Sequence, residues 1–151
     1  MGKSGGTDVF LGEYRHALDE KGRLTLPARL REGLGERFVL TRGLEQALFV
    51  YPLEEWEKIA QKLRALPFTR ADARAFTRFF FSGAVELSPD RQGRITIPKP
   101  LLEYAGIEKN CVILGVMNRV EIWEEGRWDR YAAEQSALVA ETAERLLDFE
   151  G

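Results

Sequence analysis

A short pattern of polar residues that could bind an anionic partner occurs twice in this chain. The frame D-x-x-G-R-[LI]-T-[LI]-P begins at Asp19 and again at Asp90, which is 71 residues later (90 − 19). An aspartate at the start of a turn accepts backbone N–H bonds, and a glycine three places later supplies the positive φ of a hairpin loop. The arginine carries a rigid fork of donors that matches phosphate oxygens and guanine edges. The repeated turn is therefore a candidate binding surface.

The tips of the two predicted hairpins project polar side chains outward. Lys21 and Arg23 belong to the first tip, and Arg91 and Arg94 belong to the second. Further cations that fall nearby in sequence are Arg15, Arg29, Arg31 and Lys99.

A purely structural interpretation of the same pattern is equally plausible from local chemistry. Arg23 and Arg94 could pair with Asp19 and Asp90 across each hairpin and only staple the turn. In a third interpretation the aspartate fixes the turn and also holds the arginine ready for a partner. The residues alone leave these alternatives open.

Catalytic chemistry has little support in the sequence. The chain has one histidine, His16, and one cysteine, Cys111, so neither a zinc-binding cluster nor a nucleophile–base pair can be assembled from them. Cys111 precedes an apolar run, which favours a buried, inert thiol. We expect no enzyme, no metal and no cofactor.

Composition and charge limit the class of protein. Hydrophobic residues make up 44% and charged residues 30% of the 151 residues, which is typical of a globular protein. The formal net charge is −2, so positive side chains that bind nucleic acid would have to gather on one face. No apolar run approaches the ~20 residues needed to span a bilayer. The single cysteine and the lack of a secretory signal favour a cytoplasmic protein.

The first nine residues are polar and rich in glycine, and we expect residues 1–9 to be a disordered leader or an expression remnant. They contain GKSGG, but the spacing and preceding strand of a phosphate-binding loop are missing.

The repeat extends over the rest of the chain. Phe10 and Gly12 align with Phe81 and Gly83 at the same offset, and later apolar runs align one residue further on. We expect one unit at 10–80 and a second at 81–151, which together form one compact domain. Two copies are too few for a solenoid and suit a pseudo-two-fold pair in which each half covers the other's apolar face.

Each unit is expected to be ββαββ followed by a helical tail. The strands are predicted at 13–18, 23–26, 38–40 and 48–51 in the first unit, and at 84–88, 94–97, 112–116 and 120–123 in the second. A proline follows the second strand of each unit and suits the first turn of a short helix. The tails are predicted as helices at 52–66 and 69–81, and as one long helix at 124–149.

The duplicated F-x-G and D-x-x-G-R-[LI]-T-[LI]-P pattern resembles the MraZ family of bacterial regulators, within the AbrB-like swapped-hairpin superfamily. The resemblance covers the chain from about Phe10 to the C-terminal helix. It implies a mainly β fold with added helices, a double-split β-barrel built by the two tandem ββαββ repeats with pseudo-two-fold symmetry. It also implies a ring-shaped homo-oligomer and no small-molecule substrate.

The function implied by the resemblance is transcriptional regulation. Such a protein would bind short repeats of double-stranded DNA upstream of its own operon, and would act in the nucleoid as a repressor of the division and cell-wall gene cluster that includes its own gene. The family's D-x-x-x-R positions fall on Asp19 and Arg23 and on Asp90 and Arg94. Our hypothesis is that DNA is bound by Lys21, Arg23, Arg91, Arg94 and Arg15, and that the loops are shaped by Asp19, Gly22, Asp90 and Gly93. Unequal tip residues leave open whether both loops contact DNA alike. The alternative is a ring-forming protein-interaction module without DNA reading.

Overall fold

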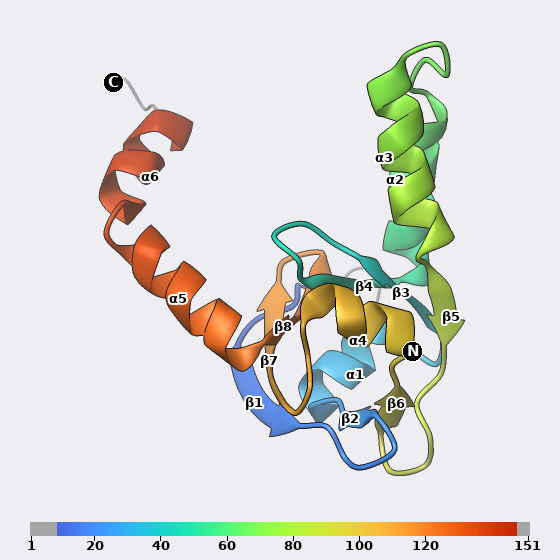
Figure 1. Ribbon diagram of the computed structural model, residues 1–151, viewed down its shortest axis with the longest axis vertical. Coiled ribbons are helices and arrows are strands. Elements are labelled where there is room, and N and C mark those ends of the chain that lie inside the picture. The colour runs from blue at the N-terminus through green and yellow to red at the C-terminus, as the bar shows by residue number, and fades with distance from the viewer. Residues whose placement is uncertain (1–8, 148–151) are drawn as a thin grey trace.

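The structure, a computed structural model, describes residues 9–147, so most of the predicted leader lies outside the described residues. The two units follow the predicted ββαββ order (Figure 1). The first unit contains β1 (Glu13–Ala17), β2 (Arg23–Thr25), α1 (Ala28–Leu34), β3 (Phe38–Arg42) and β4 (Leu48–Pro52). The second contains β5 (Val85–Leu87), β6 (Arg94–Thr96), α4 (Lys99–Ala105), β7 (Asn110–Val116) and β8 (Arg119–Glu124).

Helical tails follow both units. The first tail is a hairpin of α2 (Leu53–Arg64) and α3 (Ala71–Ser82), close to the predicted ranges. The second tail is α5 (Glu125–Ser136) followed by α6 (Val139–Leu147). The single long helix predicted for 124–149 is therefore wrong, because Ala137 and Leu138 interrupt it. Neither residue is a glycine or proline, so the sequence carries no conventional signal for the break.

The strands form two antiparallel sheets. The larger has six strands in the order β1-β7-β8-β4-β3-β5, and the smaller pairs β2 with β6. β1 pairs with β7 and β5 pairs with β3, so each half lends a strand to the other. The fold is thus a mixture of antiparallel sheet and helices. The described strands do not close into one continuous barrel, because β1 and β5 form the two edges of the larger sheet.

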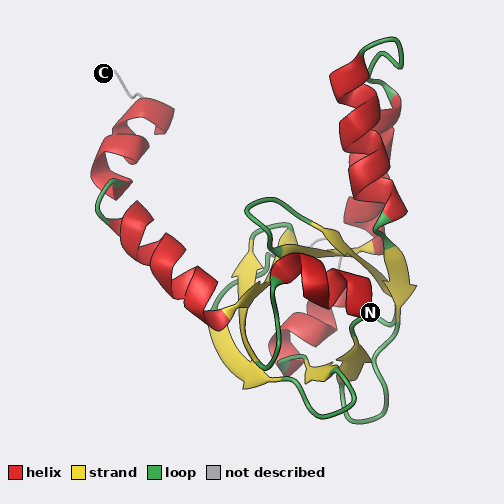
Figure 2. Ribbon diagram, in the orientation of Figure 1, coloured by secondary structure: helices red, strands yellow, loops and turns green. Residues whose placement is uncertain are grey.

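The main core is shared by the two halves. Leu24 of β2 lies opposite Ile95 of β6, and both side chains are buried, with Phe38, Ile113 and further aliphatic residues in the same cluster. The helices α1 and α4 lie within the curve of the strands (Figure 2). Each begins after a proline whose φ of −57° is already compatible with a helix. Neither half could bury these apolar side chains alone.

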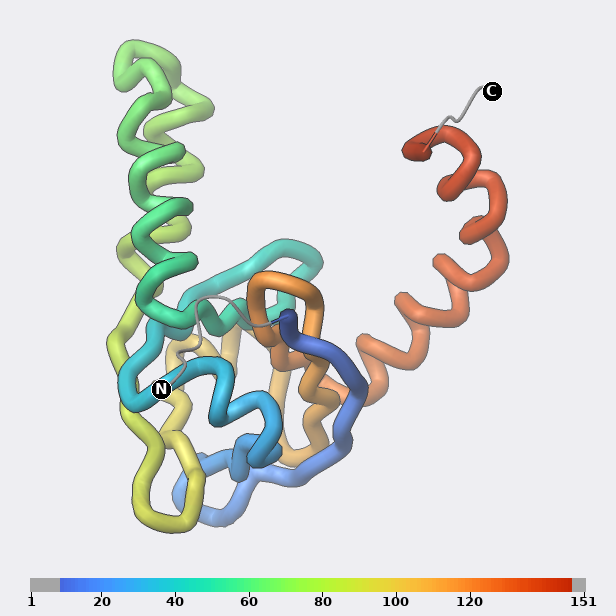
Figure 3. The backbone as a smooth tube through the Cα atoms, turned by 180° about the vertical axis from the view of Figure 1, so that it is seen from behind, coloured from blue at the N-terminus to red at the C-terminus, as the bar shows by residue number. Residues whose placement is uncertain are grey.

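The opposite face of the larger sheet carries a second, aromatic cluster. Alternate residues of β4 and β8 point to this face, including Phe49, Tyr51 and Trp123. Phe80 of α3 is part of this cluster, and the partly buried Trp128 of α5 packs against it. The ends of both tails nearest the sheet pack on this cluster. Their outer parts extend from the body as two separate arms, the α2–α3 hairpin and the α5–α6 pair (Figures 1 and 3).

Candidate nucleic-acid interface

The two repeated turns have the same set of hydrogen bonds. Asp19 Oδ1 accepts the backbone N–H groups of Lys21 and Arg23 at 2.8 and 2.9 Å, and Asp90 Oδ1 accepts those of Gln92 and Arg94 at 2.9 and 2.9 Å. In each turn the aspartate also exchanges backbone bonds with the glycine and the arginine that follow. The aspartate therefore shapes a tight loop.

The same aspartates hold the arginines. Arg23 Nε donates to Asp19 Oδ2 at 2.6 Å, and Arg94 Nε donates to Asp90 Oδ2 at 2.8 Å. The terminal nitrogens of Arg23 make no hydrogen bond to the described residues, and Arg94 Nη1 lies 3.9 Å from Asp19 Oδ2. Both side chains are about one-quarter exposed. Each arginine is thus fixed through Nε, which both the structural and the third interpretation expect, and further guanidinium donors remain for another molecule.

The two glycines are required by the backbone. Gly22 has φ +75° and Gly93 has φ +80°, in the region that L-residues rarely adopt. Each glycine carbonyl also bonds to the other half, since Leu26 N donates to Gly93 O and Ile97 N donates to Gly22 O. Each turn is thus hydrogen-bonded to the residue that follows the opposite strand, at one end of the two-stranded ribbon.

The outer face of the β2–β6 ribbon forms a regular polar surface. Leu24 and Ile95 point into the core, so the residues on either side point outward. Arg23 lies opposite Thr96, and Thr25 lies opposite Arg94. We name the outward set of Arg23, Thr25, Arg94 and Thr96 the ribbon face. The two threonines were not among the predicted site residues, although the apolar alternation of each strand could have indicated them.

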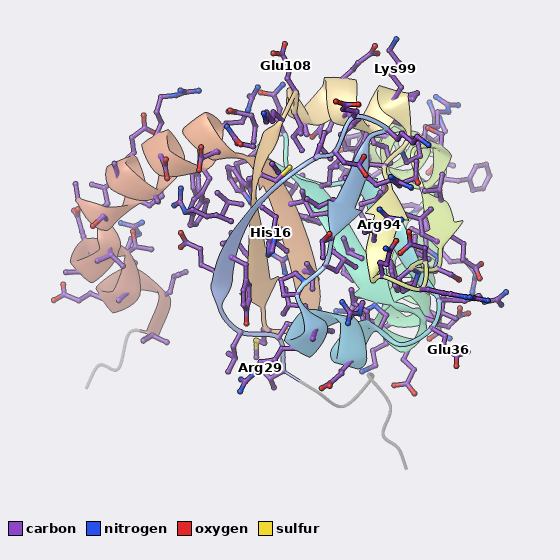
Figure 4. All side chains as sticks on the ribbon, turned by 90° about the horizontal axis from the view of Figure 1, so that it is seen from below. His16, Arg29, Glu36, Arg94, Lys99 and Glu108 are labelled. Carbon is purple, nitrogen blue, oxygen red and sulfur yellow. The ribbon has the colours of Figure 1, made fainter. Side chains whose placement is uncertain are left out.

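The exposed tip residues Lys21 and Arg91 extend the ribbon face at its two ends. Both tips lie at the end of the molecule opposite the helical arms (Figures 1 and 3). Seen from below, Arg94 lies right of the centre, Lys99 lies at the upper edge and Arg29 lies at the lower edge (Figure 4). This view of a chain whose net charge is −2 thus shows basic residues together with the acidic residues Glu36 and Glu108.

Arg15 is placed differently from the other predicted DNA-binding residues. It lies in β1, and its guanidinium donates to three carboxylates, those of Glu13, Glu125 and Asp129, at 2.8 to 3.4 Å. These bonds raise its pKa. Its donors are used to join β1 to α5, so we leave Arg15 out of the interface that we propose below.

The other kinds of site considered from the sequence are a metal site and a reactive cysteine. Within 9–147 no group of histidine, cysteine and acidic residues could hold a metal ion. Separately, none of the described helices is long and apolar enough to cross a membrane. Cys111 is buried, and burial raises the pKa of its thiol to about 12, which keeps it protonated and unreactive.

Acid should weaken the two turns. The N–H groups of Arg23 and Arg94 hold the pKa of Asp19 and Asp90 below the usual 3.8. A lowered pKa in the folded state stabilises the protein above pH 3.8, and this contribution disappears as the pH falls through the folded-state pKa. We expect the advantage in Tm of wild type over Asp19→Asn/Asp90→Asn to be constant near neutral pH and to shrink below pH 3.8. A matched exposed change, Glu36→Gln, should not show this loss, and a constant Tm difference at all pH values would contradict the assignment.

The fold and the site define a protein of two tandem units joined through one arginine-bearing ribbon. The profile of the family described as "MraZ protein, putative antitoxin-like" matches residues 9–79 and 80–150. Proteins named transcriptional regulator MraZ from Pelotomaculum thermopropionicum and Desulforamulus reducens are 59% and 56% identical over 141 residues, which cover 93% of this chain and 97% and 99% of theirs. One from Heliobacterium modesticaldum is 58% identical over 94% of this chain and 99% of its own. The chain belongs to the MraZ family, as the sequence pattern predicted.

Proposed function

We propose that this protein is a sequence-specific DNA-binding transcriptional regulator that reads DNA with the ribbon face and its two tips. The observation that carries the proposal is the pair of aspartate-held arginines on one two-stranded ribbon, at the end of the molecule away from the acidic C-terminal arm. The printed names of the relatives support the same function.

The shape of the ribbon suits the DNA major groove, which admits a two-stranded β-ribbon. Arg23 and Arg94 would supply donors to guanine edges, and the hydroxyl and methyl groups of Thr25 and Thr96 would contact neighbouring bases. Lys21 and Arg91 would bind phosphates and set the register of the complex. Because the arginines are already held by the aspartates, little side-chain entropy would be lost on binding.

We also propose the swapped-hairpin barrel as the description of the shared core, with residues 10–80 and 81–151 as its two halves. The exchange of strands between halves supports it, since β1 pairs with β7 and β5 pairs with β3. The β2–β6 ribbon would then be the part of the barrel that faces the DNA.

The protein would act as a homo-oligomeric ring. No residue of α6 is buried, and an isolated helix of its length is marginal in water. The outer end of the α2–α3 hairpin exposes Phe68 and Leu66 beside a hollow of about 350 Å³. These two apolar surfaces differ and lie on separate arms, so their pairing between copies would be head-to-tail, the arrangement from which rings are built (Figure 1).

The proposed regulatory role is repression of the division and cell-wall gene cluster, including the protein's own gene, by binding to short repeats upstream. The protein would work in the cytoplasm on the nucleoid, without a cofactor. The exposed apolar arms also fit the alternative, a ring-forming interaction module. The exposed, outward-facing tips favour DNA, because a pure interaction module has no need of them.

The test is fluorescence anisotropy of wild-type protein with duplex DNA from upstream of its own gene and with a shuffled duplex. We expect preferential binding to the upstream duplex, and an affinity that falls steeply between 50 and 200 mM salt, by roughly 3.5-fold for each phosphate contact. Equal, weak binding to both duplexes would contradict sequence-specific reading and would favour the interaction module.

A further inference from the structure

The two tips of the ribbon have the same internal hydrogen bonds, but the side chains around them differ. Their internal hydrogen bonds match one for one, as described above. Any difference between them must therefore come from side chains that differ at equivalent positions of the two halves, either outside the repeated frame or at its two variable positions.

The first difference is the side chain that backs each glycine. A Cβ added to Gly93 would overlap the guanidinium of Arg31, which reaches across from α1 and donates to Leu26 O at 2.7 Å. The equivalent position in α4 is Leu102 (31 + 71), and its Cδ1 would lie 3.9 Å from a Cβ on Gly22. The second tip is thus backed by a cation and the first by an aliphatic side chain.

The second difference is the charge of the tips themselves. The first tip has two acidic and two basic side chains, whereas the second has one acidic and two basic side chains. The four positions are Asp19, Glu20, Lys21 and Arg23 in the first tip and Asp90, Arg91, Gln92 and Arg94 in the second. Glu20 stands directly beside Lys21 and lowers the attraction of that tip for an anion. Both differences favour the second tip as the stronger binder of a polyanion.

We propose that the second tip is the principal phosphate-binding end of the ribbon, with Arg91 as the contact and Arg31 as the residue that positions the loop and adds charge behind it. This inference rests on the proposed DNA-binding function. Each subunit would be anchored on DNA mainly through the second tip, because Glu20 would weaken the phosphate contact of Lys21 at the first tip.

The consequence can be measured through salt. Each phosphate contact contributes about 0.9 to the slope of log affinity against log salt concentration. A residue that only supports the fold changes the affinity without changing this slope, so the slope separates a phosphate contact from a structural role.

The main test compares two variants that each remove one positive charge, Arg91→Gln and Lys21→Gln, with the upstream duplex of the protein's own gene at 50 to 200 mM salt. We expect Arg91→Gln to lower the slope by about 0.9 and so to change the affinity ratio to wild type about 3.5-fold across this range. Lys21→Gln should lower the slope by less than half as much as Arg91→Gln does. Equal slopes for the two variants, or a larger loss for Lys21→Gln, would overturn the inference.

A second pair tests the role of Arg31. Arg31→Leu introduces the residue type found at the equivalent position of the other half, and Arg29→Leu removes the same charge from an exposed position of α1. Arg31→Leu should lower the affinity and the slope more than Arg29→Leu does, and equal effects would remove Arg31 from the inference. If Arg31→Leu loses its circular dichroism spectrum, the Arg91 and Lys21 comparison still decides. Absence of binding by wild type would instead contradict the proposed function itself.

Discussion

Replacing both ribbon arginines, in Arg23→Ala/Arg94→Ala, should lower the affinity for the upstream duplex by about 100-fold or more while the fold persists. A well-placed arginine contact to a base contributes about 1–3 kcal/mol of discrimination, so loss of two contacts reaches this factor. The variant should also bind the upstream and shuffled duplexes nearly alike. Anisotropy titrations of both duplexes give the affinities directly.

The fold of this variant should survive because the turns do not depend on the guanidinium groups alone. Asp19 and Asp90 keep the backbone N–H bonds that define each loop, and Leu24 and Ile95 remain buried beneath the ribbon. These ion pairs are partly exposed, and pairs near a protein surface contribute only about 0–1 kcal/mol to stability. Circular dichroism and light scattering would check this point.

The matched control removes two arginines from elsewhere in the chain, in Arg37→Ala/Arg130→Ala. It has the same net charge as the ribbon variant, and Arg37 pairs with Glu86 alone among residues 9–147, at an exposed site. This control should keep sequence preference. If the ribbon variant kept wild-type affinity, or if the control lost as much, the ribbon face would not be the DNA-reading surface.

The local design of the site could be predicted from the sequence because each turn is specified within five residues. Asp19, Gly22 and Arg23 act on one another at short range, and their spacing alone determines which backbone groups they can reach. The ββαββ order was predictable for a similar reason, since apolar alternation and Pro27 mark the ends of the strands.

What the sequence could not provide is set by contacts between the halves. The bond from Leu26 N to Gly93 O and the position of Arg31 against Gly93 join residues more than 60 positions apart. Arg15 was predicted as a DNA contact because it is a cation near the turn in sequence, but three carboxylates, two of them from α5, surround it. Sequence proximity says nothing of such partners.

The helical tails show the same limit. Their apolar spacing predicted helices, but it did not show which apolar residues pack within the chain. Trp128 packs beside the aromatic cluster, whereas Leu138 and Leu146, further along the predicted stripe, are 48% and 76% exposed. A stripe that is partly buried near the sheet and exposed at its far end indicates a second partner for the outer part.

The second large effect is expected from breaking contacts between the arms, in Phe68→Asp or in Leu146→Asp. Phe68 is 80% exposed on the loop between α2 and α3, where Arg74 Nη1 donates to the carbonyl oxygen of Phe68. Leu146 is exposed on α6. The outer hairpin is rich in arginine and lysine, and the end of the C-terminal arm carries Glu134, Glu141 and Glu144, so the two surfaces are complementary in charge as well as apolar. Either change should shift the mass measured by light scattering to smaller species.

Loss of the assembly should lower the affinity for DNA only when several subunits bind the same duplex. Linked sites gain about 10²- to 10⁴-fold through effective concentration, so affinity for a duplex with several repeats should fall by a factor in this range. Affinity for a duplex with one repeat should stay near wild type, because the ribbon face lies at the other end of each subunit. Leu11→Asp, at a site 69% exposed in the segment before β1, is the control. An unchanged mass for both arm variants would exclude the arms as the subunit contact, whereas equal losses on the two duplexes would mean that the arms affect the DNA-reading site itself.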